Sequence, residues 1–358
     1  MQPIRLVVVF GGQSAEHDVS CTTASHVLAA ADPSRYEIEA IGITRTGRVV
    51  RAEAAMAALA SGAAELPPAL NPEGPSTDLT TVAARPVEPG QTVVVLPLLH
   101  GPLGEDGTIQ GLLELAGVPY VGSGVLGSAV TMDKVMAKTI IAASGIPQTR
   151  WTSMTEGDEQ TDDVLNAIAA DLGYPIFVKP ANMGSSVGVS KTRDLEELRA
   201  AVSLAFRYDE LIVLEEGVDA REIELAVLGN RDVRVSVPGE IKPAADFYDY
   251  EDKYHDGEAE LLIPAPLSDE ATKELQELAS KAYKALRCEG MARADFLVEE
   301  GGRGPLLNEL NTIPGFTPIS MYPKMWEASG VSYGQLIDEL VRLALDRHER
   351  RSAKRVTH

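Results

Sequence analysis

The chain has 358 residues and a formal net charge of −21, with 44% hydrophobic and 24% charged residues. This composition is that of a globular protein, and it argues against disorder or a fibrous repeat. The negative charge argues against broad electrostatic attraction to nucleic acid or to anionic membranes, so we expect neither as a partner.

The length predicts two or three domains, at about 150 residues each. No segment has the roughly 18 to 20 apolar residues that a membrane span needs, and the start of the chain does not have the layout of a signal peptide. We therefore expect a cytoplasmic protein. Cys21 and Cys288 lie far apart in the sequence, which favours reduced structural thiols over a disulfide framework or a zinc site.

The first part of the chain alternates strand and helix patterns. The apolar run Ile4–Phe10 ends in two glycines, which is typical of a buried parallel strand followed by a tight turn. A helix is predicted from about Asp18 to Ala31, and further strands near Tyr36–Ile43 and Thr92–Leu99. We therefore predict an α/β fold that starts with an open parallel α/β domain, with functional loops at the carboxyl ends of its strands.

Three domains are predicted, with the ranges 1–131, 132–229 and 230–358. Residues 53–91, which are rich in Ala, Pro and Glu, are predicted to form a surface excursion with at most one short helix. The second domain begins where Asp133 opens a helix after several glycines.

Two features are predicted within the third domain. Residues 240–263 are long, polar and rich in aromatic residues, as expected of a lid over a reacting site. An amphipathic helix is predicted near Ser332–Asp346, followed by a basic, frayed tail at Arg347–Lys354.

A lysine at the end of a predicted strand leads into a loop rich in glycine and serine. The strand Pro175–Pro180 carries Lys179, and the loop that follows contains Gly184, Ser185 and Ser186. Small residues with free backbone N–H groups can cradle phosphate oxygens. The spacing differs from that of a P-loop, and a Gly/Ser hairpin can equally be a simple turn.

Near the C-terminus, two short apolar segments flank a turn-like stretch and carry acids. Residues two apart in a strand share a face, so Arg293 and Asp295 point the same way, and so do Glu309 and Asn311. Hard oxygen ligands suit Mg²⁺, which usually binds through one or two carboxylates and substrate phosphates. This hairpin, 292–311, therefore indicates a metal–nucleotide site, and a polar hairpin with solvated acids is the alternative.

Taken together, these segments resemble the D-alanine–D-alanine ligase family of the ATP-grasp superfamily along nearly the whole chain. The matching blocks are Phe10–Ser20, Leu99–Thr108, Met132–Lys134, Lys179–Gly188, Phe247–Tyr254, Arg293–Asp295 and Asn308–Thr317. A generic ATP-grasp protein would share only the phosphate-binding lysines and the acid-bearing hairpin 292–311, which is called the acid hairpin below. The resemblance implies that a two-part ATP-grasp fold, in which α+β sheets sandwich ATP, follows the N-terminal substrate-binding domain.

The resemblance implies ATP-dependent ligation of two D-alanine molecules to D-alanyl-D-alanine for peptidoglycan precursor synthesis, with ADP and phosphate as the other products. In the family, the first D-alanine is phosphorylated on its carboxylate, and the amine of the second attacks the acyl phosphate. Such chemistry needs positioning and charge stabilisation more than a nucleophilic side chain. The resemblance also implies two Mg²⁺ ions, with Mn²⁺ as an alternative, and a homodimer.

The resemblance places the first D-alanine among residues from several blocks. Glu16 matches the acceptor for its ammonium group, with Val19 and His100 beside it. Arg293 and the backbone N–H of Gly315 match an oxyanion site, a role that suits preorganised donors.

Further matches concern the second D-alanine and the lid. Ser320 and Met321 match the site of the second carboxylate, where Met321 replaces a frequent leucine, a volume-conserving change. In the lid, Lys253 matches a phosphate contact, and the Tyr254 hydroxyl matches a group hydrogen-bonded with Glu16 and Ser185.

The resemblance assigns the nucleotide and metal contacts as well. Lys134 and Lys179 match the lysines that bind the ATP phosphates, because a lysine offers a point charge. Carboxylates can accept from ribose hydroxyls or the adenine amino group. The implied nucleotide contacts are Lys134, Lys179, Ser186, Glu215, Glu216, Val218, Glu222, Lys253 and Asn308, and the implied Mg²⁺ ligands are Asp295, Glu309 and Asn311.

Three other functions fit parts of the pattern. Relatives that make D-alanyl-D-lactate carry phenylalanine or a different, histidine-containing lid at the position of Tyr254, so this tyrosine favours the dipeptide product. Another ATP-grasp carboxylate–amine ligase would lack the block that contains Glu16. A catalytically silent nucleotide-binding protein could share the fold, but each phosphate, metal and oxyanion position expected from the family carries a chemically competent residue.

Overall fold

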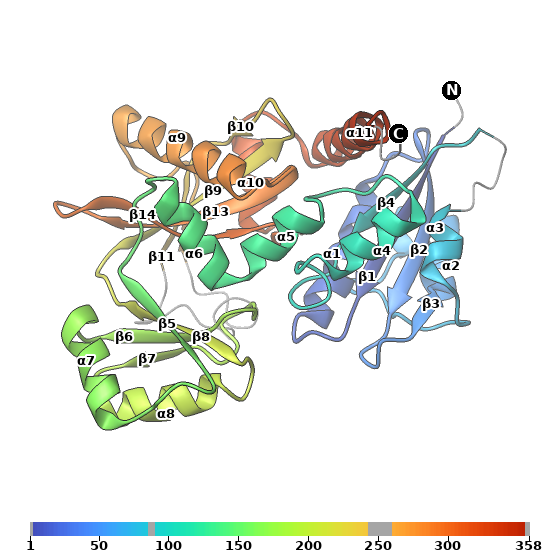
Figure 1. Ribbon diagram of the computed structural model, residues 1–358. Coiled ribbons are helices and arrows are strands. Elements are labelled where there is room, and N and C mark those ends of the chain that lie inside the picture. The colour runs from blue at the N-terminus through green and yellow to red at the C-terminus, as the bar shows by residue number, and fades with distance from the viewer. Residues whose placement is uncertain (1–2, 85–89, 243–259, 355–358) are drawn as a thin grey trace.

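The computed structural model describes residues 3–84, 90–242 and 260–354, which form three sheets with helices packed around them (Figure 1). The N-terminal sheet has the strand order β3-β2-β1-β4. β1 (Ile4–Gly11) pairs in parallel with β2 (Tyr36–Ile43) and β4 (Val93–Pro97), while β3 (Val49–Arg51) is antiparallel to β2. Residues 6–10 have no exposed surface, which explains why this run forms a central strand.

Helices follow the strands of this domain, and the first of them, α1, lies where a helix was predicted. α1 (His17–Ala30) begins after the turn that ends β1, and α4 (Thr108–Ala116) follows β4. The turns after β1 and β4 therefore leave the same edge of the sheet, where open α/β domains bind ligands. The prediction of an N-terminal open α/β domain is confirmed.

The segment between β3 and β4 holds more regular structure than predicted. α2 (Glu53–Ser61), a 3₁₀ turn (Ala63–Glu65) and α3 (Leu79–Ala84) lie here, so the expectation of at most one short helix was wrong. Alanine has the highest helix propensity, and five of the nine residues of α2 are alanines. α2 is fixed by burial of Ala55, and α3 by burial of Leu79 and Val82, three residues apart on one helix face.

The central sheet has the order β5-β8-β6-β7 and is antiparallel throughout. Its strands are β5 (Trp151–Thr155), β6 (Ile176–Pro180), β7 (Ser190–Thr192) and β8 (Leu211–Glu216). α7 (Asp162–Leu172) and α8 (Leu195–Ala205) cover one face and form a separate apolar core with it (Figure 1, lower left). The other face is left to border a cavity, and it carries Phe177 and Lys179.

The C-terminal sheet has the order β12-β11-β9-β13-β14, with β10 also paired to β9, and its described strand pairs are antiparallel. Its strands are β9 (Arg221–Gly229), β10 (Arg234–Val235), β11 (Gly239–Lys242), β12 (Glu260–Leu262), β13 (Gly290–Glu299) and β14 (Gly304–Asn311). One apolar core joins this sheet to α6 (Lys134–Ala143) and α9 (Asp269–Ala285). α10 (Met321–Ala328) packs against β9, and α5 (Val125–Met132) leads into α6.

The three-domain division stays a prediction, and the strand pairing adds one detail to it. β9 ends at the predicted boundary between residues 229 and 230, yet it pairs with β13 and β11 rather than with the central sheet. By sheet membership, the third unit begins nearer Arg221.

The C-terminal helix is longer than predicted. α11 (Tyr333–Ser352) begins with a capping box between Ser332 and Gln335 and continues through most of the segment that was predicted to fray. The prediction of a frayed tail was wrong because Arg347 is 3% exposed and donates to the backbone oxygens of Tyr120 and Gly122. α11 therefore holds the N-terminal domain against the C-terminal sheet.

Two further expectations can be compared with the structure. Cys21 and Cys288 are buried free thiols, as predicted, and burial raises their pKa to about 12 and about 11. In the described ranges, the helices include none whose length and hydropathy would suit a membrane crossing.

Candidate active site

A cavity of about 1490 Å³ lies where the N-terminal loops meet the central and C-terminal sheets. Its walls contain every described residue that the sequence analysis selected. These are Glu16, Val19, His100, Lys134, Lys179, Ser185, Ser186, Glu215, Glu216, Val218, Glu222, Arg293, Asp295, Asn308, Glu309, Asn311, Gly315, Ser320 and Met321. Residues 240–242 and 260–262 of the predicted lid, 240–263, belong to β11 and β12, and its middle part, residues 243–259 with Lys253 and Tyr254, lies outside the described residues.

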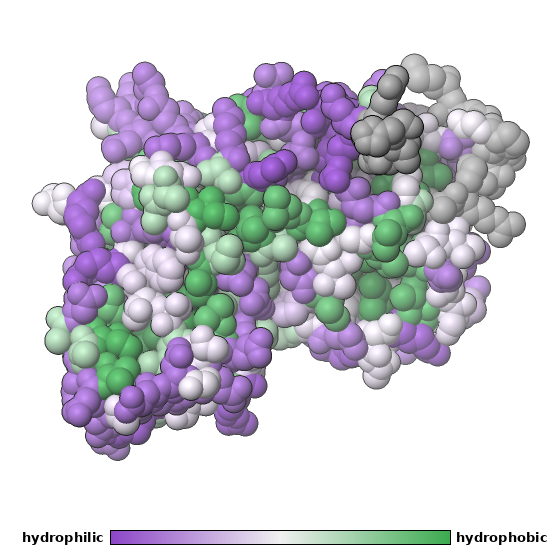
Figure 2. All heavy atoms as spheres, in the orientation of Figure 1, coloured by the Kyte–Doolittle hydropathy of each residue, from purple (hydrophilic) through white to green (hydrophobic). Residues whose placement is uncertain are grey.

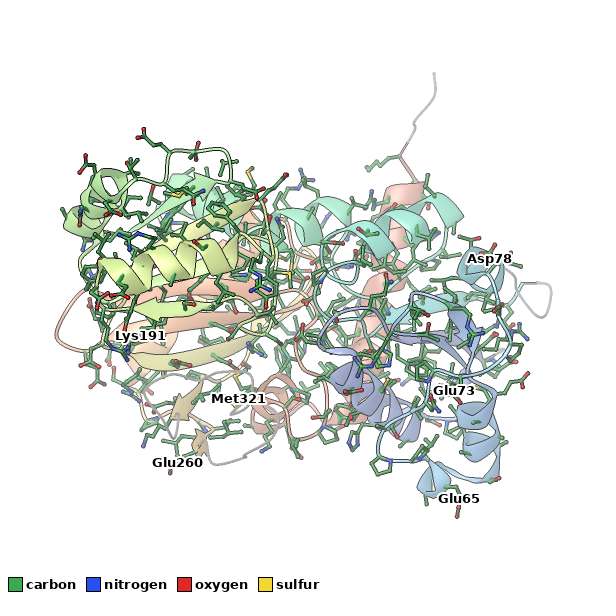
Figure 3. The ribbon with its side chains drawn as sticks, turned by 90° about the horizontal axis from the view of Figure 1, so that it is seen from below. Glu65, Glu73, Asp78, Lys191, Glu260 and Met321 are labelled. Atoms are coloured by element: carbon green, nitrogen blue, oxygen red, sulfur yellow. The ribbon has the colours of Figure 1, made fainter. Side chains whose placement is uncertain are left out.

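The view from below locates the cavity relative to the surface excursion (Figure 3). Glu65, Glu73 and Asp78 of the excursion lie along the outer edge of the N-terminal domain. Lys191 and Met321, which both line the cavity, lie on the side of the other two sheets. Among the residues of the excursion that the structure describes, 53–84, 90 and 91, none lines the cavity.

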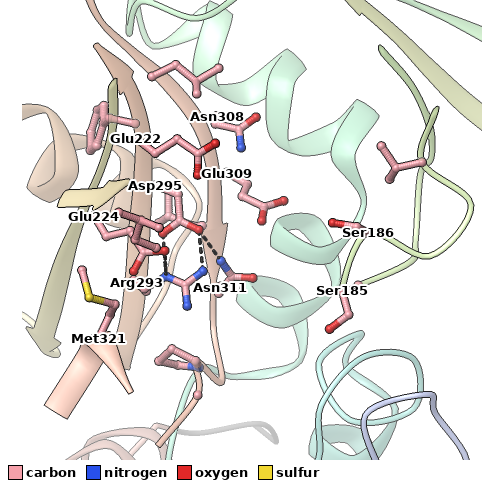
Figure 4. Close-up of a pocket in the computed structure, with 18 of the residues that line it drawn as sticks. Ser185, Ser186, Glu222, Glu224, Arg293, Asp295, Asn308, Glu309, Asn311 and Met321 are labelled. Carbon is pink, nitrogen blue, oxygen red and sulfur yellow. Dashed lines mark hydrogen bonds and ion pairs between the residues drawn. The ribbon is translucent and has the colours of Figure 1, made fainter. Parts of the chain in front are cut away.

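The acid hairpin has the geometry that was predicted for it. The register pairs Arg293 with Asn311 and Asp295 with Glu309, and all four side chains border the cavity. Arg293 Nε and Nη2 donate to the two Asp295 oxygens at 2.7 and 2.6 Å, and Asn311 Nδ2 donates to Asp295 Oδ2 at 2.9 Å (Figure 4).

A β-bulge adds Asn308 to this group. The register shifts between Asp295 and Phe296, so that Phe296 pairs with Leu307 and Asn308 is the extra residue of β14. Asn308 consequently borders the cavity next to Glu309 instead of facing the core, and its Oδ1 lies 3.4 Å from Lys179 Nζ.

Glu224 belongs to the same cluster, although sequence reasoning did not select it. Glu224 Oε1 lies 3.1 Å from Arg293 Nε, because β9 pairs Glu224 with Asp295. Burial alone would lower the pKa of Arg293, but Asp295 and Glu224 hold it well above the usual range. The spacing of Glu222 and Glu224 on a strand was the available signal, since residues two apart share a face.

The chemistry of the donor set fits a hard divalent cation. Asp295 and Glu309 supply carboxylates, and Asn311 has its amide oxygen left to bind a cation, since its Nδ2 donates to Asp295. Two carboxylates and an amide oxygen suit Mg²⁺, which completes its shell with water and substrate phosphates. Within the described ranges, no three Asp, Glu, His or Cys side chains form a cluster that could hold a metal.

The two predicted phosphate lysines lie on different elements that flank the Gly/Ser loop. Lys134 begins α6 directly after the N-cap residue Asp133, and its Nζ donates to the Met183 backbone oxygen at 2.6 Å. Lys179 is the last residue but one of β6 and donates to Glu215 Oε2 at 2.7 Å. Burial lowers the pKa of Lys134; it would do the same for Lys179, but Glu215 leaves the pKa of Lys179 raised.

The Gly/Ser loop contacts the N-terminal domain through a short hydrogen bond. Ser185 Oγ donates to Glu16 Oε1 at 2.5 Å, across 169 residues of sequence. Ser185 and Ser186 both have positive φ angles, 48° and 58°, which non-glycine residues seldom adopt. Strained backbone of this kind concentrates at ligand-binding sites, and both serines border the cavity.

His100 and Glu105 hold the chain just before Gly315. His100 Nδ1 lies 2.9 Å from the Ile313 backbone oxygen, and Glu105 accepts from the backbone N–H groups of Ile313 and Gly101 at 3.0 and 2.8 Å. Burial, followed by the nearby Glu16 carboxylate, raises the pKa of Glu105 to about 8. Sequence reasoning missed Glu105, although it lies five residues after His100 in a block that matched the family.

The His100 ring has a second nitrogen, and His100 is one of the residues that line the cavity. His100 Nε2 is buried and has no hydrogen-bond partner in the described part of the chain. Buried polar atoms are usually satisfied, so this nitrogen is available to a ligand.

Local contacts also position Gly315, Ser320 and Glu216, which line the cavity. A side chain at Gly315 would lie 3.2 Å from Ser320 Oγ, which itself accepts from the Thr317 backbone N–H at 3.2 Å. Glu216 accepts from Arg150 Nε at 2.8 Å and from Arg303 Nη1 at 2.5 Å. Arg303 lies in the turn of the acid hairpin, so this contact bridges the central and C-terminal sheets.

Known proteins resemble the chain over its full length. The family model described as D-ala D-ala ligase N-terminus matches residues 5–123, and the model described as D-ala D-ala ligase C-terminus matches residues 140–342. A D-alanine–D-alanine ligase of Bacillus pumilus is 46% identical over 99% of both chains.

Solved structures agree with this similarity. The VanG D-Ala:D-Ser ligase of Enterococcus faecalis superposes with a TM-score of 0.81 at 36% identity, covering 96% of this chain and 100% of that one. A D-alanine–D-alanine ligase of Bacillus anthracis complexed with ATP gives a TM-score of 0.73 at 28% identity, covering 97% of this chain and 99% of that one.

Proposed function

The chain belongs to the D-alanine–D-alanine ligase family of ATP-dependent ligases, and we propose how its cavity makes D-alanyl-D-alanine for peptidoglycan precursors. The observation that carries the proposal is the meeting of three sets of residues in one cavity. Glu16 comes from the N-terminal domain, Lys179 from the central sheet, and Arg293 with Asp295 from the C-terminal sheet.

The proposed reaction has two steps. A carboxylate oxygen of the first D-alanine attacks the terminal phosphorus of ATP, the bond from that phosphorus to ADP breaks, and an acyl phosphate forms. The amine of the second D-alanine, after losing a proton, attacks the carbonyl carbon, and phosphate leaves with the electrons of the C–O bond. Both steps develop negative charge on oxygen, so preorganised cations and N–H donors are the groups that lower the barrier.

The N-terminal side of the cavity would bind the first D-alanine. Glu16 is a carboxylate whose Oε1 is held by Ser185, so it can accept from the substrate ammonium group in a fixed orientation. His100 Nε2, which is buried and has no partner among the described residues, would contact the same substrate, with Val19 supplying apolar surface.

The C-terminal side would bind the developing oxyanion and the second substrate. Arg293 is held by Asp295 and Glu224, so its guanidinium cannot turn freely. The backbone N–H of Gly315 is the second donor, and the hold of His100 and Glu105 on Ile313 fixes the chain that carries it. Ser320 and Met321 would receive the carboxylate of the second D-alanine at the start of α10.

The nucleotide would lie between the central and C-terminal sheets. Lys134 and Lys179 would meet its phosphates with Ser186 of the Gly/Ser loop and Asn308. The base and ribose would lie toward the end of β8. Contacts there are proposed for Glu215, Glu216, Val218 and Glu222, and Lys253 of the lid is proposed to join the phosphate contacts.

Asp295, Glu309 and Asn311 are proposed to hold Mg²⁺, with two ions as the expected number and Mn²⁺ as a substitute. When bound, such ions neutralise charge on the terminal phosphates. The chain's own part is to fix the three oxygen donors, and Arg293 and the register of β13 and β14 do so.

We propose a homodimer, and the surface supports one region as its interface. An apolar band runs over α6, α5 and α4 in Figure 2. Its exposed side chains include Leu115, Leu126 and Met136, which are 91%, 53% and 46% exposed. Contiguous exposed apolar surface of this kind usually marks a protein contact.

The function is tested by phosphate release from purified protein with ATP, Mg²⁺ and D-alanine, with products identified by mass. L-alanine, D-alanine plus D-lactate, and D-alanine plus D-serine are the comparison reactions, the last because one similar structure is a D-Ala:D-Ser ligase. We expect D-alanyl-D-alanine to be the main product and turnover to stop when a chelator removes the metal. Nucleotide binding without turnover would instead indicate a silent binder.

The preference for an amine as second substrate is proposed to depend on Tyr254. Tyr254→Phe should raise the use of D-lactate relative to D-alanine, because it removes the hydroxyl proposed to bond with Glu16 and Ser185. An unchanged product ratio across pH would contradict this assignment.

A further inference from the structure

A buried lysine that the sequence analysis did not select lies near the two predicted phosphate lysines, Lys134 and Lys179. Lys138 is in α6, one turn after Lys134, and its side chain is 3% exposed. Residues four apart on a helix share a face, so both lysines point toward the cavity that they line. Lys138 Nζ donates to Glu215 Oε1 at 2.5 Å and lies 3.4 Å from Thr149 Oγ1.

Glu215 is shared between two lysines. Its Oε1 accepts from Lys138 and from the Thr149 hydroxyl, and its Oε2 accepts from Lys179 Nζ at 2.7 Å. Burial alone would raise the pKa of Glu215, but Lys138 and Lys179 lower it far below the usual range, so the carboxylate is ionised. Two ammonium groups therefore face one buried carboxylate.

The two lysines differ in their freedom to reach a ligand. Lys138 is enclosed, whereas Lys179 is 17% exposed and also approaches Asn308 Oδ1 on the acid hairpin at 3.4 Å. Lys179 can thus turn toward an anion in the cavity more readily than Lys138, whose Nζ is buried against Glu215 and Thr149. When Lys179 turns away, Glu215 would become a buried, uncompensated carboxylate unless a second cation stays beside it, and such a charge is strongly unfavourable.

We propose that Lys138 is a positioning residue for nucleotide binding. Its ammonium group balances the charge of the buried Glu215 carboxylate, so that Lys179 can leave Glu215 and bind the phosphates. The inference rests on the proposed function only in taking a nucleoside triphosphate as the anion. Without Lys138, Glu215 would retain Lys179 and compete with the phosphates for it. The loss of affinity should therefore appear for ligands with phosphates and be small for the bare nucleoside.

The test compares ATP with adenosine as calorimetric ligands of the full chain, in the presence of Mg²⁺. Lys138→Met removes the charge and keeps an unbranched side chain of similar length. We expect its Kd for ATP to rise at least about tenfold, which is about 1.4 kcal/mol, and its Kd for adenosine to change less than about twofold. Equal losses for both ligands would overturn the proposal, because a merely structural residue would weaken both.

Two further variants keep the test decisive if Lys138→Met fails to fold. Lys138→Arg retains the cation and should keep the wild-type ratio of the two dissociation constants. Thr149→Val removes a hydrogen bond to the same carboxylate oxygen without changing charge, and it should also leave that ratio unchanged. A changed ratio in either variant would contradict a role that depends on charge.

The double variant Lys138→Met/Glu215→Gln removes the carboxylate charge together with the ammonium. We expect the ratio of its Kd for ATP to its Kd for adenosine to fall back toward the wild-type ratio, because Lys179 no longer has a charged competitor. Loss of the proposed Glu215 contact with the base or ribose would weaken both ligands and leave this ratio unaffected. A ratio no lower than that of Lys138→Met would refute the mechanism. These titrations need no ligation, so an absence of D-alanine-dependent phosphate release in the wild type would refute the proposed function without touching this inference.

Discussion

Replacing Arg347 should destabilise the protein far more than replacing another arginine of the same helix. Arg347 is 3% exposed, donates to the Tyr120 backbone oxygen at 3.0 Å and to the Gly122 oxygen, and lies 4.0 Å from the centroid of the Tyr120 ring. Arg347→Met would keep the apolar stem and remove the guanidinium, leaving two backbone carbonyls without this donor.

The size of the loss follows from these contacts. A hydrogen bond to a charged group contributes about 1.5 to 3 kcal/mol, and a desolvated cation–π contact about 1 to 2 kcal/mol. Allowing for incomplete additivity, we expect Arg347→Met to lower the free energy of unfolding by about 3 to 5 kcal/mol. At about 2 °C per kcal/mol for a chain of this size, the unfolding midpoint should fall by about 6 to 10 °C.

The assay is thermal and urea unfolding followed by circular dichroism, with Arg342→Met as the matched control. Arg342 is in the same helix, is 60% exposed and pairs with Glu339, so its loss should change stability by less than about 1 kcal/mol. Arg347→Lys keeps a charge but lacks the planar fork that reaches both carbonyls. Its unfolding midpoint should therefore lie between those of Arg347→Met and Arg342→Met. If Arg347→Met and Arg342→Met unfold at the same temperature, the buried contacts of Arg347 do not hold the domains together.

Three other predictions concern the reaction, pH and assembly. Arg293→Lys should lower kcat at least about a hundredfold with little change in ATP affinity, because a lysine cannot keep both bonds to Asp295 while facing the oxyanion, and steady-state kinetics with separate nucleotide titration will show whether the losses divide this way. Folding raises the pKa of Glu105 from 4.5 to about 8, so the native state keeps a proton that the unfolded chain releases. The stability from this proton is complete below about pH 4.5 and is lost as the pH rises through 8. Glu105→Gln should therefore flatten the pH dependence of the unfolding temperature between pH 5 and 9. An equally steep pH dependence in the variant would assign it to other groups. Leu115→Glu should convert a dimer to a monomer in light scattering, while Tyr208→Glu, at a 46% exposed site outside the apolar band, should not; dimers in both variants would place the interface elsewhere.

The parts of the site that were predicted from sequence depend on local geometry. The shared face of Arg293 and Asp295 follows from the two-residue repeat of a strand, and Lys179 at the end of an apolar run follows from strand length. Each of these two predictions could be made from a single segment of the sequence. The grouping of these segments in one cavity required the family resemblance, because no local pattern states which strand ends lie together.

The residues that were missed make their contacts over long sequence separations. Lys138 meets Glu215 across 77 residues, and Glu105 meets Ile313 across 208 residues. Arg347 was assigned to a frayed tail because a basic terminal segment is usually solvated, and its partners, Tyr120 and Gly122, lie in the N-terminal domain. A buried charge can be recognised from sequence only when its partner is known, and here each partner comes from another sheet or domain.

The apolar cores suggest which part of the molecule moves most easily. One core joins the N-terminal sheet to α11 and to residues of the C-terminal sheet, such as Ala226 and Met291, so these two parts share buried surface. The core of the central sheet contains residues between 154 and 214 alone.

The central sheet meets the rest of the cavity largely through polar contacts, among them Ser185 with Glu16, Lys179 with Asn308, and Glu216 with Arg303. A hydrogen bond contributes about 0.5 to 1.5 kcal/mol net, and up to about 3 kcal/mol when a charged group takes part. Separating a few such contacts is therefore far less costly than opening an apolar core. Substitutions at these polar contacts should accordingly change KM and kcat more than the unfolding temperature, whereas substitutions in the shared core should do the reverse.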